Sequence, residues 1–208
     1  MKKLTQMPKS PASTPKGMTS MPHKQKGNML LSLGITLMIT VILSVWGIPK
    51  IKDYLVEGAI PSVAQDTQKY LARVQTNSMG AGTTPYKGID QKAFSRDVRG
   101  SSLQVGDRSG ESGGGTVVRH GLGGNGDAGT VTIAETGDTL ALTFKSLNRA
   151  ACPGLATAMS QSVEDMTING AVVKSTDETN TVKVAYQAGS AGANCLDGDV
   201  NEMVFTIK

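Results

Sequence analysis

The stretch Lys24–Tyr54, KQKGNMLLSLGITLMITVILSVWGIPKIKDY, decides how the rest of the chain is organised. No ionisable side chain lies in the 22 residues from Asn28 to Pro49. A helix of that length can cross a hydrocarbon core of about 30 Å. Each central Leu, Ile or Val favours insertion by about 0.3–0.6 kcal/mol, and no charge opposes it. The sequence therefore predicts a membrane-inserted helix.

The residues on either side of this window set its orientation and its fate. Residues 1–27 carry six lysines and no acidic residue. Such a tail is retained in the cytoplasm, so the C-terminal part is expected to cross the membrane. A secretory signal would have a shorter apolar run followed by small residues at a cleavage site. Here Ile48, Pro49 and Lys50 follow a longer run, which indicates that the helix stays on the protein.

Gly27 directly precedes the apolar run and follows the basic tail. This arrangement resembles a type IV prepilin, in which a peptidase cuts after the Gly on the cytoplasmic side. Pro49 lies 21 residues beyond Asn28 and precedes a charged segment that contains a Tyr, which is a second likeness to that family. The resemblance implies cleavage between Gly27 and Asn28 and N-methylation of Asn28. Because proline interrupts helical hydrogen bonding, we also expect a helix kink at Pro49.

The fifth position after the expected cleavage departs from the family pattern. The family normally has Glu there, and this chain has Ser32. The family likeness implies that the carboxylate neutralises the N-terminal amine of a neighbouring subunit, in surroundings where an unpaired charge is costly. Ser32 can offer a hydrogen bond but no counter-charge. Two interpretations therefore stay open, a bulk subunit and a minor, initiating or tip component.

Charge is distributed unevenly along the chain. The formal net charge is +4 and the pI about 9.1. Residues 1–27 carry +6, residues 28–77 carry +1 and residues 78–208 carry −3. The basic pI thus belongs to a targeting tail and does not indicate an anionic ligand. Aromatic residues make up only 4% of the chain, so we expect no nucleic-acid partner.

Beyond Pro49 the apolar residues recur at intervals of three and four, which predicts an amphipathic continuation of the helix to Asn77 or Gly80. Pro49, Gly58 and Pro61 are expected to kink or loosen it. We expect the head to cover the apolar face. Its members are Ile51, Tyr54, Leu55, Ala59, Val63, Thr67, Tyr70, Leu71 and Val74.

Residues 78–129 contain 14 glycines. A few short strands joined by irregular loop are expected there, with Thr116–Arg119 as one of them. No phosphate-binding GK[ST] follows the glycines. His120 has no His, Cys or Glu at a metal-ligand spacing, and Ser112, His120 and Asp127 form no triad pattern. The sequence predicts no catalytic, cofactor-binding or metal site, and no enzyme.

From Thr130 the pattern becomes that of an antiparallel sheet. Residues 130–135 and 139–145 alternate around Gly137–Asp138, which predicts a β-hairpin. Asn169–Gly170 predicts a second hairpin with a type I′ turn. Residues 181–187 and 202–208 are predicted to form two more strands. Helical spacing between the hairpins, from Leu147 to Ser162, predicts a short helix that begins near Cys152.

Cys152 and Cys195 lie on the side expected to be translocated, where disulfides persist. Two cysteines allow only one pairing. In the chain-entropy account, a disulfide that closes a loop of this length stabilises the folded protein by about 4 kcal/mol. The alternative, two free thiols in a cytosolic protein, disagrees with the membrane segment.

The order of elements resembles the type IVb pilins, which include PilS-like and bundle-forming pilins. The closest local likeness is TLALTFKSLNRAACPGLATAM, residues 139–159. The resemblance implies an α+β fold, with a long N-terminal hydrophobic α-helix packed against a C-terminal antiparallel β-sheet head. It also implies three parts: a leader, residues 1–27; a helix, residues 28–77, with its membrane or filament-core half at 28–49 and its amphipathic half at 50–77; and a head, residues 78–208.

The implied function is that of a Gram-negative type IVb pilus subunit, which polymerises through its helix into a thin filament for adhesion or conjugative contact. Its implied partners are other pilin subunits, the prepilin peptidase, and an inner-membrane assembly platform with its ATPase. The protein would be a single-pass inner-membrane protein with a periplasmic head before assembly, and part of the extracellular pilus afterwards. Three alternatives remain, namely a minor pilin or pseudopilin, a signal-anchored periplasmic binding domain that never polymerises, and an anchored hydrolase.

Overall fold

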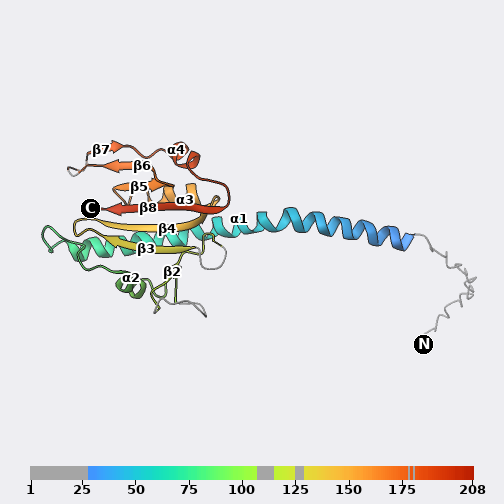
Figure 1. Ribbon diagram of the computed structural model, residues 1–208, viewed down its shortest axis with the longest axis horizontal. Coiled ribbons are helices and arrows are strands. Elements are labelled where there is room, and N and C mark those ends of the chain that lie inside the picture. Colours follow the sequence, from blue (N-terminus) through green and yellow to red (C-terminus); the bar gives the residue numbers. More distant parts are fainter. Residues whose placement is uncertain (1–27, 107–114, 125–128, 178, 180) are drawn as a thin grey trace, which may run out of the picture. The chain divides into compact units, whose positions relative to one another are not determined.

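Figure 1 shows the computed structural model, which describes residues 28–106, 115–124, 129–177, 179 and 181–208. The chain divides into two compact units, Met1–Ser44 and Val45–Lys208. The boundary between them falls inside the first helix, α1 (Asn28–Ser78). The expected long N-terminal helix is confirmed, and the helix continues past Pro49 and Pro61, although neither proline can donate a backbone hydrogen bond. A kink at Pro49 stays a prediction.

The second half of α1 is amphipathic, as its sequence predicts. Val56, Val63, Leu71 and Val74 are buried. Their spacing of three, seven and eight places them on one side of a helix with 3.6 residues per turn. This side supplies part of the hydrophobic core of the head.

The predicted apolar face was wrong at its first three positions. Ile51, Tyr54 and Leu55 are 60%, 74% and 71% exposed. The residue one turn before Val56 on the buried side is Lys52, whose ammonium group pairs with Asp199. Because Lys52 is charged, a search for apolar spacing passes over it and follows the neighbouring face instead.

In the part of the chain that the structure describes, eight strands form one antiparallel sheet in the order β1-β2-β3-β4-β8-β5-β6-β7 (Figure 1). The C-terminal strand β8 lies in the middle, between β4 and β5, so the expectation of a C-terminus held in the sheet is confirmed. The strand bounds are β1 Gln104–Val105, β2 Val118–Arg119, β3 Thr130–Glu135, β4 Leu140–Asn148, β5 Asp165–Ile168, β6 Ala171–Thr176, β7 Val182–Val184 and β8 Asp199–Ile207.

Both predicted hairpins are present. Strands β3 and β4 pair from Val131–Phe144 to Glu135–Leu140, and β5 and β6 pair across Asn169–Gly170. The φ angles of Asn169 and Gly170 are 51° and 81°. A type I′ turn requires positive φ at both central residues, and Asn followed by Gly tolerates this best. The turn chemistry therefore fixes the register of this hairpin.

The sheet buries alternate residues of its central strands. Among them are Leu142, Phe144 and Phe205, and the rings of Phe144 and Phe205 meet edge to face at 5.5 Å. The helix α3 (Ala151–Met159) joins α1 in this core. The Gln68 side chain on α1 donates to the Ala158 carbonyl on α3 over 2.7 Å, which ties the two helices together.

Two short helices were not predicted from the sequence. The helix α2 (Gln91–Asp97) lies in the glycine-rich region, where only short strands and loop were expected. The helix α4 (Ala188–Ala193) follows β7, which is shorter than the predicted strand at residues 181–187. The Ala, Gly and Ser of α4 give no apolar periodicity from which a helix could be inferred.

The α2 helix covers part of one edge of the β3–β4 hairpin. The Gln91 side chain accepts from the Ile133 N–H over 2.9 Å and donates to the Val131 carbonyl over 3.1 Å. It thus bonds β3 both at Val131, which pairs with Val118 of β2, and at Ile133, beyond the two residues of β2. Covered edges of this kind protect a sheet from pairing with another chain.

Two glycines allow a close approach of backbone beside β4. A Cβ at Gly123 would lie 2.4 Å from the Asn148 backbone nitrogen, and one at Gly129 would lie 2.4 Å from the Gly123 carbonyl oxygen. The Asn148 N–H donates to the Leu122 carbonyl over 2.9 Å. At these two positions any side chain would force the backbones apart.

Candidate functional site

The first half of α1 is apolar and exposed along its whole described length. No side chain from Met29 to Val45 is covered within the part of the chain that the structure describes. Leu37, for example, is 59% exposed and Ile42 51%. Exposed apolar surface on this scale marks a site for a membrane or another protein.

The hydroxyl groups in this half of α1 are satisfied inside the helix. Thr36, Thr40 and Ser44 donate to the carbonyls of Ser32, Thr36 and Thr40, each over 2.8 Å. Back-bonding to the carbonyl four residues earlier removes a donor that would otherwise need water. Because polar groups in an apolar medium must be satisfied internally, these three hydroxyls allow burial of the helix.

Length and composition make α1 a candidate membrane span. It is the one such helix among the described residues, over Met29–Ser78, with a mean hydropathy of 2.2 in its most apolar window. Signal sequences near an N-terminus are equally long and apolar. Length and hydropathy therefore indicate the environment of the helix and do not identify the protein. They agree with the inserted helix predicted from the sequence.

The sequence-predicted processing residues lie at the start of α1. Gly27 lies outside the described residues, as does the whole leader, and Asn28 is the first residue of α1. Ser32 lies in the first turns of the helix and is exposed. Cleavage at Gly27 and methylation of Asn28 stay predictions.

Lys52 anchors α1 to the head at the point where its burial begins. Its ammonium group pairs with Asp199 at the start of β8, and Asp199 also accepts from the Asn148 side chain over 2.7 Å. Burial raises the pKa of Asp199, but the bonds from Lys52 and Asn148 outweigh burial and hold the pKa below its ordinary value. Sequence reasoning missed this anchor because nothing local links positions 52, 148 and 199.

The disulfide joins Cys152 of α3 to Cys195, just after α4, with Cα atoms 6.0 Å apart. This is the predicted pairing. Asn201 lies beside it, fully buried, and its side chain holds the chain near Cys195 by accepting from the Leu196 N–H and donating to the Leu196 carbonyl. Asn169 donates to Asn201 over 2.9 Å, so the β5–β6 turn is joined to the same cluster.

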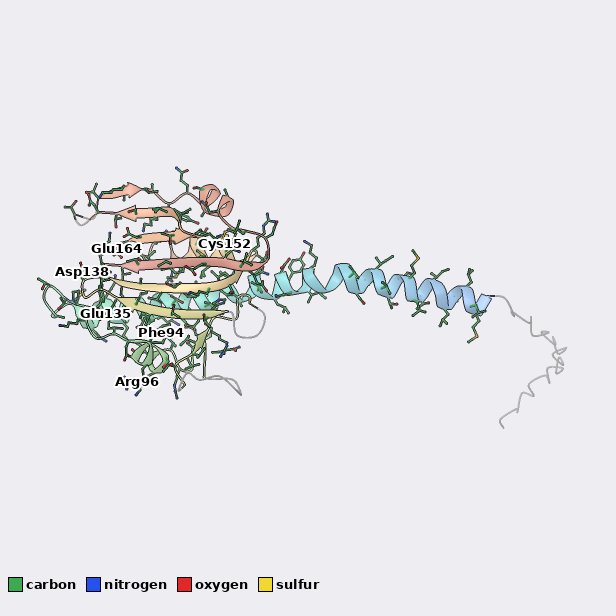
Figure 2. The ribbon with its side chains drawn as sticks, in the orientation of Figure 1. Phe94, Arg96, Glu135, Asp138, Cys152 and Glu164 are labelled. Carbon is green, nitrogen blue, oxygen red and sulfur yellow. A yellow bond between two sulfur atoms is a disulfide. The ribbon has the colours of Figure 1, made fainter. Side chains whose placement is uncertain are left out.

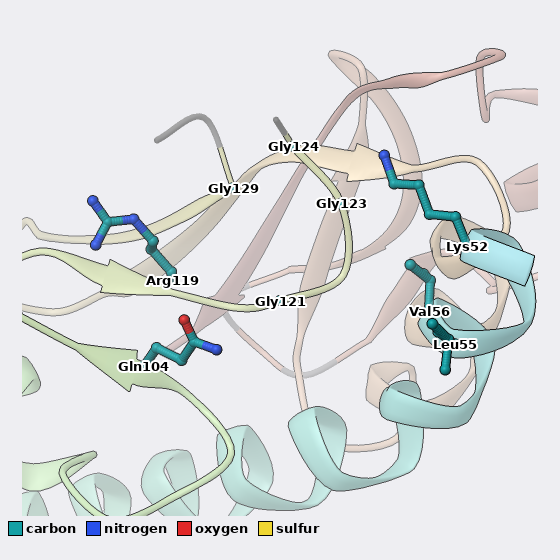
Figure 3. A pocket seen from close by; sticks show the side chains of 9 residues that line it. All are labelled: Lys52, Leu55, Val56, Gln104, Arg119, Gly121, Gly123, Gly124 and Gly129. Carbon is teal, nitrogen blue, oxygen red and sulfur yellow. The ribbon is translucent and has the colours of Figure 1, made fainter. Parts of the chain in front are cut away.

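Two open hollows flank Lys52 within the head unit. One, of about 320 Å³, is lined by Leu55 and Val56 of α1, by glycines and by Arg119 (Figure 3). Arg119 donates to the Gly106 carbonyl over 2.9 Å. The other, of about 990 Å³, is lined by side chains of both charges, including Glu57 and Arg149. Among the described residues that line these hollows, no nucleophile is combined with a base.

His120 is a structural residue. It is 1% exposed, and its Nδ1 accepts from the Leu122 N–H over 2.9 Å. Its Nε2 therefore carries the proton and donates to the Lys145 carbonyl over 2.8 Å. Burial lowers the pKa of His120, which favours this neutral form. Ser112 and Asp127 lie outside the described residues, among which no group of three His, Cys, Asp or Glu could hold a metal.

Comparison with known proteins identifies the family of the chain. A family model described as PilS N terminal matches residues 63–208. A comparison with curated proteins found no match. A crystal structure of the type IV b pilin from Salmonella typhi shares 16% identity at a TM-score of 0.42, covering 66% of this chain and 95% of its own. That structural similarity is too weak to argue from, whereas the family model spans most of the chain. The chain therefore belongs to the PilS family, which confirms the resemblance to type IVb pilins found in its sequence.

Proposed function

We propose that this pilin polymerises through α1 into a type IVb pilus, a thin surface filament for adhesion or conjugative mating contact. The observation that carries the proposal is the exposed apolar half of α1, whose side chains from Met29 to Val45 find no cover among the described residues of their own chain. Apolar surface of this extent is stable only in a membrane or against other subunits. A pilin meets both surroundings in turn.

The proposed assembly begins at the inner membrane. The precursor inserts with its basic leader in the cytoplasm and its head in the periplasm, and the prepilin peptidase cuts between Gly27 and Asn28. Methylation of Asn28 follows. An assembly platform driven by its ATPase then moves the subunit from the membrane into the extracellular filament. The chain supplies surfaces for these partners and itself performs no chemical step.

In the filament the first half of α1 packs against the same half of other subunits. Leu, Ile, Val and Met side chains supply the contacts, and the internally bonded hydroxyls of Thr36, Thr40 and Ser44 let the helix leave water without stranding a donor. A contact between two different faces of one subunit type does not close on itself, so repetition yields a fibre.

Ser32 favours a second candidate, a minor pilin or pseudopilin that initiates or tips the filament. The hydroxyl of Ser32 cannot neutralise the N-terminal amine of a neighbouring subunit. A subunit at the end of a filament has fewer such neighbours, and the missing carboxylate would cost it less than it costs a subunit inside.

The test is the intact mass of the protein from the membrane fraction and from sheared surface filaments. We expect a chain that begins at Asn28 with one added methyl in the sheared fraction, and its abundance there separates the main subunit from a minor one. A chain that begins at Met1 and stays in the membrane would refute the proposal and favour the anchored, non-polymerising domain. A matched Gly27→Ala variant should accumulate uncut in the membrane.

A further inference from the structure

The charges of the head are divided unevenly between two segments of the chain. Residues 66–106, which include the end of α1 and all of α2, contain six basic and three acidic residues. Residues 129–208, which supply most of the sheet, contain five basic and nine acidic residues. Surfaces of opposite charge on two copies of one protein attract each other.

The basic side is concentrated on one face of α2 and the residues that directly follow it. Lys92, Arg96 and Arg99, here called the basic ridge, follow one another at intervals of four and three and are all exposed. On the opposite face Phe94 and Val98 are buried. No side chain of the ridge forms an ion pair with any residue that the structure describes. The ridge is therefore a set of aligned cations open to a partner.

The ridge stands on a fixed platform. The carboxylate of Asp90 caps α2 by accepting from the Ala93 N–H over 2.7 Å. The Phe94 ring meets the Tyr70 ring of α1 edge to face at 4.9 Å, and Gln91 is bonded to β3. With the helix held at its start, its core face and the sheet edge, little backbone entropy is lost when the ridge is bound.

The acidic surface lies where the β3–β4 turn and the start of β5 meet the end of β8. Leu140 pairs with Ile207 and Asp165 with Thr206, which brings these segments together. Three carboxylates gather there, whereas Arg96 projects from α2 (Figure 2). These carboxylates, here called the acidic end, belong to Glu135, Asp138 and Glu164. The Lys208 N–H donates to the Glu164 carboxylate, and the Lys208 amine is engaged by Asp165 over 2.7 Å. Lys174 also lies close enough to act on the charge of Glu164.

Asp138 is the most available carboxylate of the acidic end. It is exposed, and its described contact is a hydrogen bond from the Thr136 hydroxyl over 2.9 Å. The Glu135 carboxylate already accepts from the N–H groups of Gly88 and Gly137. Burial raises the pKa of Glu164, so this residue gives up its proton less readily. Asp138 is therefore the natural centre of a contact with a cation.

We propose that the basic ridge of one head docks on the acidic end of a second copy, with Lys92 and Arg96 facing Asp138. The contact rests on the proposed polymerisation and adds a head-to-head interface to the packing of α1. It joins two different surfaces, so each copy can bind one neighbour through its ridge and another through its acidic end, which lets the contact repeat along a fibre. Two basic ridges repel each other, so the charges select the orientation in which neighbouring subunits are added.

Charge reversal with compensation tests this pairing in the full-length protein. In Lys92→Glu/Arg96→Glu the yield of sheared filaments at physiological salt should fall about fivefold, the size expected for two exposed ion pairs that turn repulsive. Asp138→Lys alone should lower the yield similarly, and the three changes together should restore it. Lys145→Glu, an exposed change on β4 away from the ridge, is the matched control. Wild-type yield in the ridge variant, or no rescue by Asp138→Lys, would overturn the pairing.

A second measurement does not depend on filaments. Membranes that contain equal amounts of isotope-labelled and unlabelled full-length protein are treated with a carbodiimide, which joins an amine directly to a carboxylate in contact. A mixed-isotope peptide linking Lys92 to Asp138 supports the pairing, and its absence overturns it.

If anionic polysaccharide instead binds the wild type and not the ridge variant, while both proteins form filaments equally well, the ridge binds a polyanion and the pairing is refuted. If the wild type forms no filaments but the Lys92–Asp138 cross-link is found, only the proposed polymerisation is refuted.

Discussion

Both halves of α1 carry apolar side chains, but the surroundings of these side chains are opposite. In the second half Val63 and Leu71 are each 1% exposed, because the sheet and α3 cover that side. In the first half Leu37 and Leu43 are 59% and 63% exposed, although no charged residue interrupts the segment. The comparison shows that one continuous helix of a pilin can carry two kinds of apolar surface, one completed by the chain itself and one left for a membrane or another subunit.

The polar residues of the two halves fit this difference. Thr36 and Ser44 turn their hydroxyls back on the helix, so these hydroxyls are not offered outward. Gln68 and Asp66 instead bond to other parts of the head, to the Ala158 carbonyl over 2.7 Å and the Ser102 N–H over 2.7 Å. The second half is thus fixed by directional contacts, while the first half presents mainly apolar contacts, which tolerate sliding from one environment to another.

The largest effect we predict comes from removing one leucine from each half. Leu71→Ala should lower the free energy of unfolding of the head by about 2–5 kcal/mol, the range for a buried Leu that leaves a cavity. Leu37→Ala should change it by no more than about 0.5 kcal/mol, since Leu37 is exposed and lies outside the core of the head. Denaturant unfolding of both variants in detergent measures the difference. Equal losses would mean that the first half contributes to the fold of the head.

A smaller effect is expected where α1 meets α3. A Cβ on Gly154 would lie 2.9 Å from Cδ1 of Ile60, so the two helices touch at this point. Gly154→Val should therefore cost about 1–3 kcal/mol through overpacking. The same change at Gly34, where an added Cβ would meet nothing within 4 Å, should leave the unfolding of the head unchanged.

Thermal unfolding can distinguish the two glycine variants by the melting temperature of the head. Gly34→Val introduces a β-branched residue into the exposed apolar half of α1, and its effect should appear in filament yield and not in the melting temperature of the head. If Gly154→Val melts as the wild type does, Ile60 has moved aside and the α1–α3 contact is looser than the distance indicates.

Much of this fold could be predicted from local patterns. Alternation around Gly137–Asp138 and the turn chemistry of Asn169–Gly170 predicted both hairpins, because strand pairing between sequence neighbours is encoded within about ten residues. The helix α2 was missed although Asp90, Phe94 and Val98 carry a capping and spacing signal. Seven residues among glycines form too short a window for periodicity to stand out.

The contacts that could not be predicted are those between distant segments. The Lys52–Asp199 pair joins residues far apart in the sequence, and neither residue belongs to a motif. Asn201 is fully buried among backbone groups of Leu147 and Leu196, which no polar pattern indicates. Burial of such polar residues depends on how the sheet is ordered, and strand order is a global property that a single sequence reveals only by resemblance.

The smallest effect concerns Lys52, which lies where the burial of α1 begins. Its side chain is 43% exposed, so the pair with Asp199 should contribute no more than about 1 kcal/mol. Asp199→Asn should lower the stability of the head by up to that amount at neutral pH. Asp197→Asn is the matched control, because Asp197 is 84% exposed and its partner Arg149 is 64% exposed, and it should change stability by less than about 0.5 kcal/mol.

The pH dependence of this last effect has a definite sign. The pKa of Asp199 is lower in the folded protein than in the unfolded chain, because the contributions of Lys52 and Asn148 exceed that of burial. Its contribution to stability is therefore complete above the unfolded pKa of about 3.9 and is lost as the pH falls through the folded pKa. The wild type and Asp199→Asn should differ at pH 7 and converge in acid. A difference that persists at the lowest pH would show that the substitution disturbs the packing at the start of β8 instead of only removing a charge.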